Sequence, residues 1–162
     1  MGMSPPISTT RMVQEVLRQA KETPHLIALT FEGKHLTYRA FAGEVARCAK
    51  ALRRQGIGPG DRVTICLPNL PQAVIAFYAV NVIGAISSMV HPLSSEGELA
   101  FFLQCAPSKA VIALGALYPK FDAIRDRVSV PLFIAVDIAD ALSPLKRIGY
   151  QFLNRGKTEP LP

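Results

Sequence analysis

A stretch of 33 consecutive residues, 63–95, contains no Asp, Glu, Lys or Arg. Its central part, residues 73–90, is mostly apolar and reaches the length at which a membrane span has to be considered. The same residues also fit a buried helix that ends at about residue 83, followed by a turn at Gly84 and a short strand. Asn81 within the stretch and prolines at its flanks favour this second interpretation. We therefore expect a buried helix followed by a buried strand, and we do not favour contact with a membrane.

The residues from 62 onward alternate between strand and helix signals. Strands are expected at 62–67, 85–90, 109–114 and 132–136, and helices at 71–83, 94–104, 118–127 and 140–152, the last interrupted near Pro144. Such alternation is typical of a parallel sheet covered by helices on both faces. The strands at 63–67 and 110–114 are apolar on both sides, as buried parallel strands are. The predicted fold class is α/β with a largely parallel sheet.

The preceding residues predict a smaller unit. Helices are expected at 9–23 and 38–55, and two short strands at 26–31 and 35–37 should form a hairpin at one edge of the sheet. Gly56 is placed to end the second helix. The expected organisation is a disordered segment 1–8, one α/β domain over 9–152 and a polar tail over 153–162.

Composition narrows the class of protein. The 162 residues suit one domain, and a hydrophobic content of 49% excludes a disordered chain. Trp is absent and aromatic residues are 7%, which argues against a nucleic-acid stacking surface.

The net charge of +6 comes mainly from residues 1–62, which hold ten Lys/Arg against five Asp/Glu. Much of that excess lies on the helix at 38–55, where a phosphate or membrane-surface patch is one interpretation. The solvated face of an amphipathic helix is the one we favour.

The cysteines indicate neither a metal site nor a redox motif. Cys48, Cys66 and Cys105 are odd in number and widely spaced, without a Cys-x-x-Cys pair. Residues 1–10 lack a basic region followed by an apolar run, so no secretory signal is expected. We predict a cytoplasmic protein with free thiols.

Motifs that carry chemistry are mostly absent from the sequence. It has no Gly-x-x-x-x-Gly-Lys-Ser/Thr loop, no Gly-x-Ser-x-Gly elbow and no His-Glu-x-x-His motif. Gly56-x-Gly58-x-Gly60 links a helix to a strand, the reverse of a dinucleotide fingerprint, and Asp61 follows it. Turn formation explains these glycines better than phosphate binding does.

Isolated titratable residues give no site either. His25, His35 and His91 lie far apart, and each is interpreted as a surface or turn histidine. The carboxylate pairs Glu96/Glu98 and Asp122/Asp126 lie at helix positions where exposure to water or the helix dipole explains an acidic residue. The residues predict no catalytic, cofactor-binding or metal-binding side chain.

Several segments in a fixed order nevertheless resemble a known family. They are Leu36-Thr37-Tyr38-Arg39-Ala40-Phe41, Leu52-Arg53-Arg54-Gln55-Gly56-Ile57-Gly58-Pro59-Gly60-Asp61-Arg62-Val63, Pro68-Asn69-Leu70-Pro71, Ala79-Val80-Asn81-Val82-Ile83-Gly84-Ala85, His91-Pro92-Leu93 and Glu98-Leu99. Together they resemble the N-terminal subdomain of the adenylate-forming, AMP-binding acyl-CoA synthetases. The resemblance covers residues 9–137.

The resemblance implies a fragment of an ATP-dependent carboxylate ligase. The family uses Mg-ATP to convert a carboxylic acid to an acyl-adenylate and passes the acyl group to a thiol, commonly coenzyme A. Its phosphate loop and C-terminal lysine match nothing in these residues. We therefore expect this chain to be inactive alone and to bind none of ATP, Mg or coenzyme A by itself. The fragment could come from a truncated gene, a split gene or an incomplete sequence. In the case of a split gene, the rest of the synthetase, on a separate chain, would be its partner.

Other interpretations stay open. His91 and Pro92 match a strand-end pair near where the family could form an acyl pocket, although a strand terminator explains them better. The chain could instead be a non-catalytic module that binds an acyl group or a protein, or a small membrane-associated protein. If a second subdomain is missing, residues 1–162 should expose a large apolar patch. Nucleic acid is not an expected partner.

Overall fold

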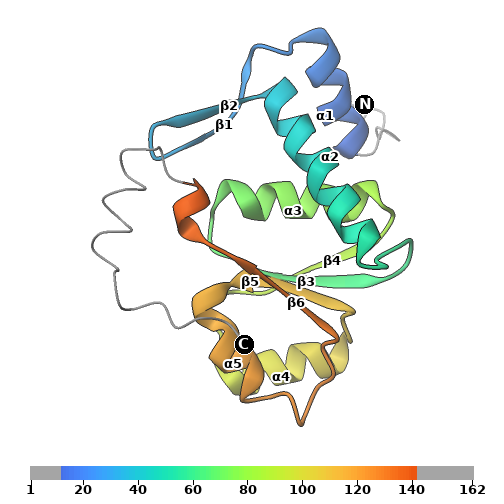
Figure 1. Ribbon diagram of the computed structural model, residues 1–162, viewed down its shortest axis with the longest axis vertical. Helices are drawn as coiled ribbons and strands as arrows, with labels where there is room; N and C mark the ends of the chain where they lie inside the picture. The colour runs from blue at the N-terminus through green and yellow to red at the C-terminus, as the bar shows by residue number, and fades with distance from the viewer. Residues whose placement is uncertain (1–11, 142–162) are drawn as a thin grey trace, which may run out of the picture.

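The computed structural model describes residues 12–141 (Figure 1). Its helices are α1 (Met12–Glu22), α2 (Tyr38–Arg54), α3 (Pro71–Val82), α4 (Glu96–Cys105) and α5 (Tyr118–Asp122). Its strands are β1 (Ile27–Phe31), β2 (Lys34–Thr37), β3 (Arg62–Cys66), β4 (Ile86–Met89), β5 (Ala110–Leu114) and β6 (Leu132–Val136). The expected disordered segment 1–8, the tail 153–162 and most of the helix predicted at 140–152 lie outside the described residues.

Four parallel strands form the main sheet in the order β4-β3-β5-β6. β3 pairs with β4 from Arg62↔Ile86 onward, and with β5 from Val63↔Ala110 onward. Parallel neighbours need long crossover connections, and the helices between the strands supply them. Figure 1 shows α2 and α3 on one face of the sheet and α4 and α5 on the other. The predicted α/β class is confirmed.

Each face of the sheet has its own apolar core. On one face, Val63 and Ile65 of β3 pack with the buried sides of α2 and α3. On the other face, Leu99 of α4 and Ile124 pack with Val111 of β5. Both sides of β3 and β5 are buried, and β5 accordingly has apolar side chains at every position. β3 has them at Val63, Ile65 and Cys66, while its Thr64 is buried with a hydrogen bond to Ser108.

The charge-free stretch folds as a helix and a strand, as predicted, but the strand is not buried, since Ile86 and Met89 of β4 are 47% and 55% exposed. α3 has 12 residues and buries Ala73, Ala76, Ala79 and Val80. It ends where Gly84 takes a φ of 78°, and the N–H of Ala85 donates to the carbonyl of Val80 at 3.1 Å. This is a Schellman end, which glycine favours at the left-handed position. Among the described residues, none of the helices has the length and apolarity that crossing a bilayer requires.

The N-terminal hairpin forms as predicted and is a small sheet of its own. β1 and β2 pair antiparallel around Glu32 and Gly33, whose positive φ values of 49° and 78° suit a two-residue turn. They form a separate two-stranded sheet that contacts α2 and α3. The hairpin thus packs on the helical layer, with residues 29–31 of β1 near Met89 at the end of the edge strand β4. The sequence of the hairpin does not indicate where it packs, because its position depends on contacts with distant residues of α3.

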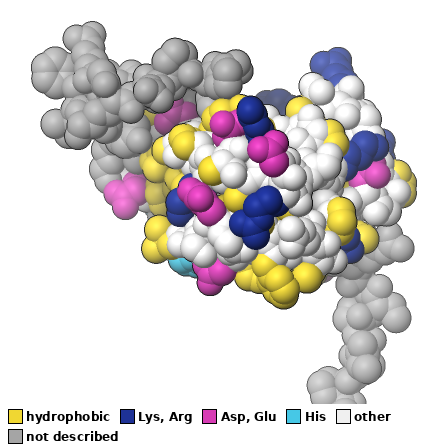
Figure 2. Space-filling model, turned by 90° about the horizontal axis from the view of Figure 1, so that it is seen from below, with side chains coloured by type: hydrophobic (Ala, Val, Ile, Leu, Met, Phe, Trp, Pro, Cys, Tyr) yellow, Lys and Arg dark blue, Asp and Glu magenta, His cyan; other side chains and the backbone are white. Residues whose placement is uncertain are grey.

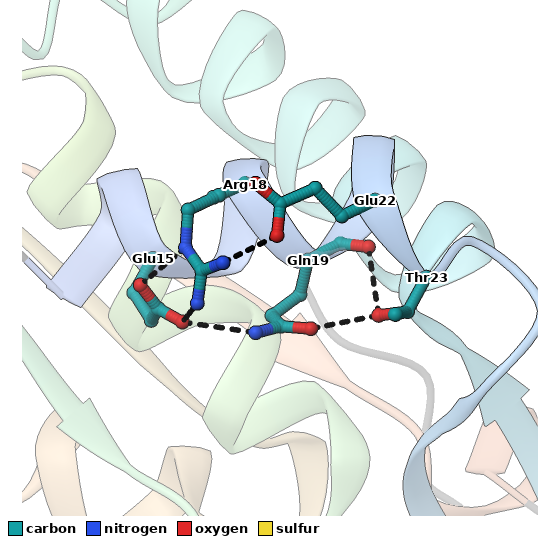
Figure 3. A network of polar contacts seen from close by, with 5 residues as sticks. All are labelled: Glu15, Arg18, Gln19, Glu22 and Thr23. Atoms are coloured by element: carbon teal, nitrogen blue, oxygen red, sulfur yellow. Dashed lines mark hydrogen bonds and ion pairs between the residues drawn. The ribbon is translucent and has the colours of Figure 1, made fainter.

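The α1 helix carries a polar network along its surface (Figure 3). Arg18 donates to the carboxylates of Glu15 and Glu22, one turn away on either side. The Thr23 hydroxyl donates to the side chain of Gln19 at 2.7 Å. The hydrogen bonds from Arg18 lower the pKa of Glu15 to about 2. These contacts stabilise α1, which has no fully buried residue.

One helix is shorter than its sequence indicates. The helix predicted at 118–127 is helical as α5 only to Asp122 and continues as hydrogen-bonded turns. The N–H of Arg127 donates to the carbonyl of Ile124, three residues back, instead of four. The tighter turns keep Ile124 inside the core, where its side chain is 1% exposed.

Candidate functional site

An open apolar groove lies near the ends of β3 and β4. Ligands of parallel α/β sheets bind outside the carboxyl ends of the strands. The groove has a volume of about 350 Å³ and its walls come from β1, the β3–α3 connection, α3 and the end of β4. It is lined by Leu29, Thr30, Phe31, Asn69, Leu70, Pro71, Ala73, Val74, Phe77 and Met89. With almost entirely apolar walls, it suits a hydrocarbon group better than a charged one.

The loop after β4 is held beside this end of the sheet by hydrogen bonds. The N–H of Leu93 donates to Nδ1 of His91 at 3.2 Å, and the N–H of Ser94 donates to the His91 carbonyl at 3.0 Å. Lys120 of α5 donates to the carbonyl of Ser94 at 3.0 Å. His91 therefore acts as a turn residue in these contacts, as its sequence context suggested.

A cysteine near the loop is buried. Cys66, the last residue of β3, has no exposed surface, and its thiol lies 3.8 Å from the His91 carbonyl as a weak donor. Burial raises the pKa of the Cys66 thiol to about 11. Because the thiolate is the nucleophile, Cys66 is not suited to covalent catalysis.

The glycine-rich connector lies at the opposite end of the sheet and does not fit a phosphate. The N–H of Gly58 donates to the Asp61 carboxylate at 2.8 Å, and the N–H of Gly60 donates to the Gly84 carbonyl at 2.9 Å. Lys109 binds the same carboxylate at 2.9 Å. The Gly58 amide and then Lys109 hold the pKa of Asp61 below its usual range. With its amides used internally and a carboxylate in place, the connector is a turn, as predicted.

Three other titratable residues singled out in the sequence, Glu98, Asp122 and His35, have structural contacts. Glu98 accepts from the N–H and hydroxyl of Ser95 in a capping box at the start of α4, which lowers its pKa. Asp122 pairs with Arg125 at 3.2 Å. His35 Nδ1 lies 3.0 Å from the hydroxyl of Thr30 on the hairpin. Within residues 12–141, no group of three or more His, Cys, Asp or Glu could hold a metal ion.

The basic side chains of α2 face solvent. Phe41, Val45, Ala49 and Leu52 turn inward, while the Arg and Lys residues at 39, 47, 50, 53 and 54 are exposed. This arrangement fits the solvated-face interpretation. Figure 2, seen from the side of α4 and α5, shows hydrophobic side chains at the surface in several groups between charged ones. Phe101 and Phe102 of α4, which contact each other edge to face, are among the exposed apolar residues.

Sequence reasoning missed the groove. Its walls join residues 29–31, 69–77 and 89, which are far apart in the chain. The local pattern pointed the other way, because a strand in a charge-free run is expected to be buried, whereas Met89 at the end of β4 is 55% exposed.

The comparisons with known proteins all point to one family. The family model for "AMP-binding enzyme" matches residues 16–153. The long-chain-fatty-acid–CoA ligase of Bacillus subtilis is 32% identical over 148 residues, which are 91% of this chain and 26% of that protein. The acetyl-coenzyme A synthetase of Methylorubrum extorquens is 40% identical over 108 residues, which are 67% of this chain and 16% of that protein. The solved fatty acyl CoA synthetase of Mycobacterium tuberculosis has a TM-score of 0.70 and 29% identity, covering 85% of this chain and 28% of that one.

The fold and the groove define a parallel α/β domain with its candidate site at the carboxyl end of the sheet. The chain belongs to the AMP-binding enzyme family. It corresponds to the N-terminal part of its longer relatives and spans about a quarter of the length of the Bacillus ligase. The resemblance stated from the sequence is confirmed.

Proposed function

We propose that this chain supplies the N-terminal part of an ATP-dependent acyl-CoA ligase, which activates a carboxylic acid as an acyl-adenylate and transfers it to coenzyme A. The main support is the family match over residues 16–153 together with the match in fold to a fatty acyl CoA synthetase. The rest of the ligase, on a separate chain, would be the partner, and exposed apolar residues such as Phe101 and Phe102 would contribute to that contact. We place the protein in the cytoplasm, where free thiols persist.

The chain alone is expected to release no pyrophosphate above background from ATP and Mg²⁺ with a panel of carboxylic acids. The family's phosphate loop, which would bind the triphosphate, matches nothing in the sequence. Among the described residues, the glycine-rich connector does not replace it, because its amides are bonded internally and it carries Asp61. Without positioned donors, the charge that develops in the transition state is not stabilised. A coupled assay for pyrophosphate measures the result.

The long-chain-fatty-acid–CoA ligase of Bacillus subtilis, assayed in the same panel, is the positive control. Its activity shows that the acids and the detection are adequate. Release by residues 1–162 that grows with enzyme concentration and requires a particular acid would contradict the proposed inactivity.

The groove supports a second candidate function, the binding of an acyl chain without catalysis. Its volume of about 350 Å³ and apolar walls suit part of a hydrocarbon chain. We expect a fluorescent fatty acid to bind the full chain, and Thr30→Asp to weaken binding roughly tenfold, about 1.4 kcal/mol. Thr30 is an exposed residue at the wall of the groove, so the variant adds a carboxylate that the hydrocarbon would desolvate.

Ser129→Asp is the matched control for this binding experiment. Ser129 is also exposed, but it lies outside the groove, so the variant adds the same charge without touching the site. Equal affinities of the two variants, or an absence of binding by the unmodified chain, would reject the groove as an acyl site. Neither result would bear on the proposed origin of the chain.

A further inference from the structure

A second pocket lies between the hairpin and the helices α2 and α3. Leu29 pairs with Leu36 and Phe31 with Lys34 in the hairpin ladder, and directly opposed side chains share one face. This face forms one wall of the pocket, whose volume is about 210 Å³. At about 30 Å³ for each water molecule, that is the volume of roughly seven waters. The pocket therefore admits a small molecule and not a segment of folded chain.

The pocket combines apolar walls with three polar side chains. Its apolar residues come from β1, β2 and α3, and they include Leu36 and Ile75. Its polar residues are Lys34 of β2, Glu44 of α2 and Gln72 of α3. The groove described above shares part of the apolar wall but is lined by none of these three polar residues. The two hollows therefore suit different classes of ligand.

The amide of Gln72 lacks a partner in the free chain. Its Oε1 is the one buried side-chain oxygen or nitrogen without a hydrogen bond among residues 12–141. Buried polar atoms are nearly always hydrogen-bonded, because an unpartnered atom loses its bonds to water without compensation. A ligand that brings an N–H donor into the pocket supplies the missing bond once the side chain turns its oxygen toward it. The pocket therefore favours a ligand with a donor group.

The two charged residues of the pocket both remain available to a ligand. Glu44 pairs with Arg47 through Oε1, which leaves Oε2 free, and its side chain is 42% exposed. Lys34 is exposed and forms no ion pair with another residue of the described part of the chain. The pocket thus presents one carboxylate and one ammonium group beside its apolar walls.

We propose that this pocket binds a free amino acid with an apolar aliphatic side chain, such as leucine. The carboxylate of the ligand lies beside Lys34, and its ammonium group donates to Glu44 and to Oε1 of Gln72. Its side chain packs on the apolar walls. A zwitterion is selected because it matches both charges of the pocket, whereas a simple acid or amine leaves one of them without a counter-charge. The inference does not depend on the proposed function.

Titration of the isotope-labelled full chain with L-leucine, followed by NMR, tests the pocket. We expect L-leucine to shift the side-chain amide signals of Gln72. Isocaproate lacks the amino group and isoamylamine lacks the carboxylate, so each should bind more weakly by roughly fivefold or more. Either analogue binding as tightly as L-leucine would overturn the inference, and so would an absence of binding by L-leucine.

Two variants separate the charges of the pocket. Lys34→Gln should weaken L-leucine by roughly fivefold without weakening isoamylamine, which has no carboxylate for Lys34. Glu44→Gln should weaken L-leucine by a similar factor without weakening isocaproate. Lys50→Gln is the matched control, because Lys50 is exposed on α2 outside the pocket, and it should leave all three affinities unchanged. Equal losses of L-leucine affinity in the three variants would instead indicate an effect of net charge and would reject the site.

Discussion

Replacing Ile65 by alanine is expected to destabilise the fold by about 2–5 kcal/mol, the range for buried Ile→Ala substitutions. Ile65 is completely buried in the middle of β3, where it packs with the residues of α2 and α3. The substitution removes three carbon atoms, and the strand neighbours on both sides prevent the core from closing over the cavity. Since folded domains are usually stable by only about 5–15 kcal/mol, the loss is a large part of the total. Urea denaturation followed by circular dichroism measures it.

Ile86→Ala on the neighbouring strand is the matched control. Ile86 is 47% exposed, so the same change of side chain removes much less buried surface and should cost under about 1 kcal/mol. The comparison fails if the two variants lose similar stability, since β3 would then not be the centre of the core. The measurement is made at low protein concentration so that association does not contribute.

Substituting two glycines by alanine is expected to change stability in opposite directions. Gly84 has a φ of 78°, and a Cβ there would lie 3.4 Å from the Cβ of Pro59. The left-handed conformation costs a residue with a Cβ about 1–2 kcal/mol, so Gly84→Ala should destabilise by at least that amount. Gly43 lies inside α2 with no neighbour within 4 Å of a Cβ, so Gly43→Ala should stabilise by about 0.5–1 kcal/mol.

The two glycine variants serve as controls for each other, because both add one methyl group. Their midpoints of denaturation should lie on opposite sides of the unmodified chain, with unchanged slopes. If Gly84→Ala were neutral, the turn that joins α3 to β4 would be able to relax. The account of the Schellman end given above would then be wrong.

Local sequence signals predicted most of the elements. Apolar periodicity placed β3, α3 and β5 within one or two residues of their observed ends, and Gly56 and Gly84 marked helix ends as positive-φ residues. These signals depend on neighbours within one or two turns. The turn in the glycine connector was also predictable from the sequence, because its contact is local: Asp61 lies only three residues from Gly58.

Features that depend on distant contacts were not predictable in the same way. Three features join segments that are far apart in the chain. They are the strand order β4-β3-β5-β6, the packing of the hairpin on α2 and α3, and the groove. The early end of α5 at Asp122 is another example, because burial of Ile124 under the sheet outweighs helix periodicity there. The site was hardest to find, since its walls are ordinary apolar residues that resemble core.

The strand order also has a consequence for synthesis of the protein. β3 comes first in the chain among the four parallel strands, yet it lies in the interior, between β4 and β5. Its two ladders close only when β5, which ends at Leu114, has left the ribosome. Pairings across such sequence separations are slow to form, so the nascent chain holds an apolar strand with an open side for that interval. The order in which the strands are made therefore creates a period in which the growing chain is most exposed to aggregation through β3.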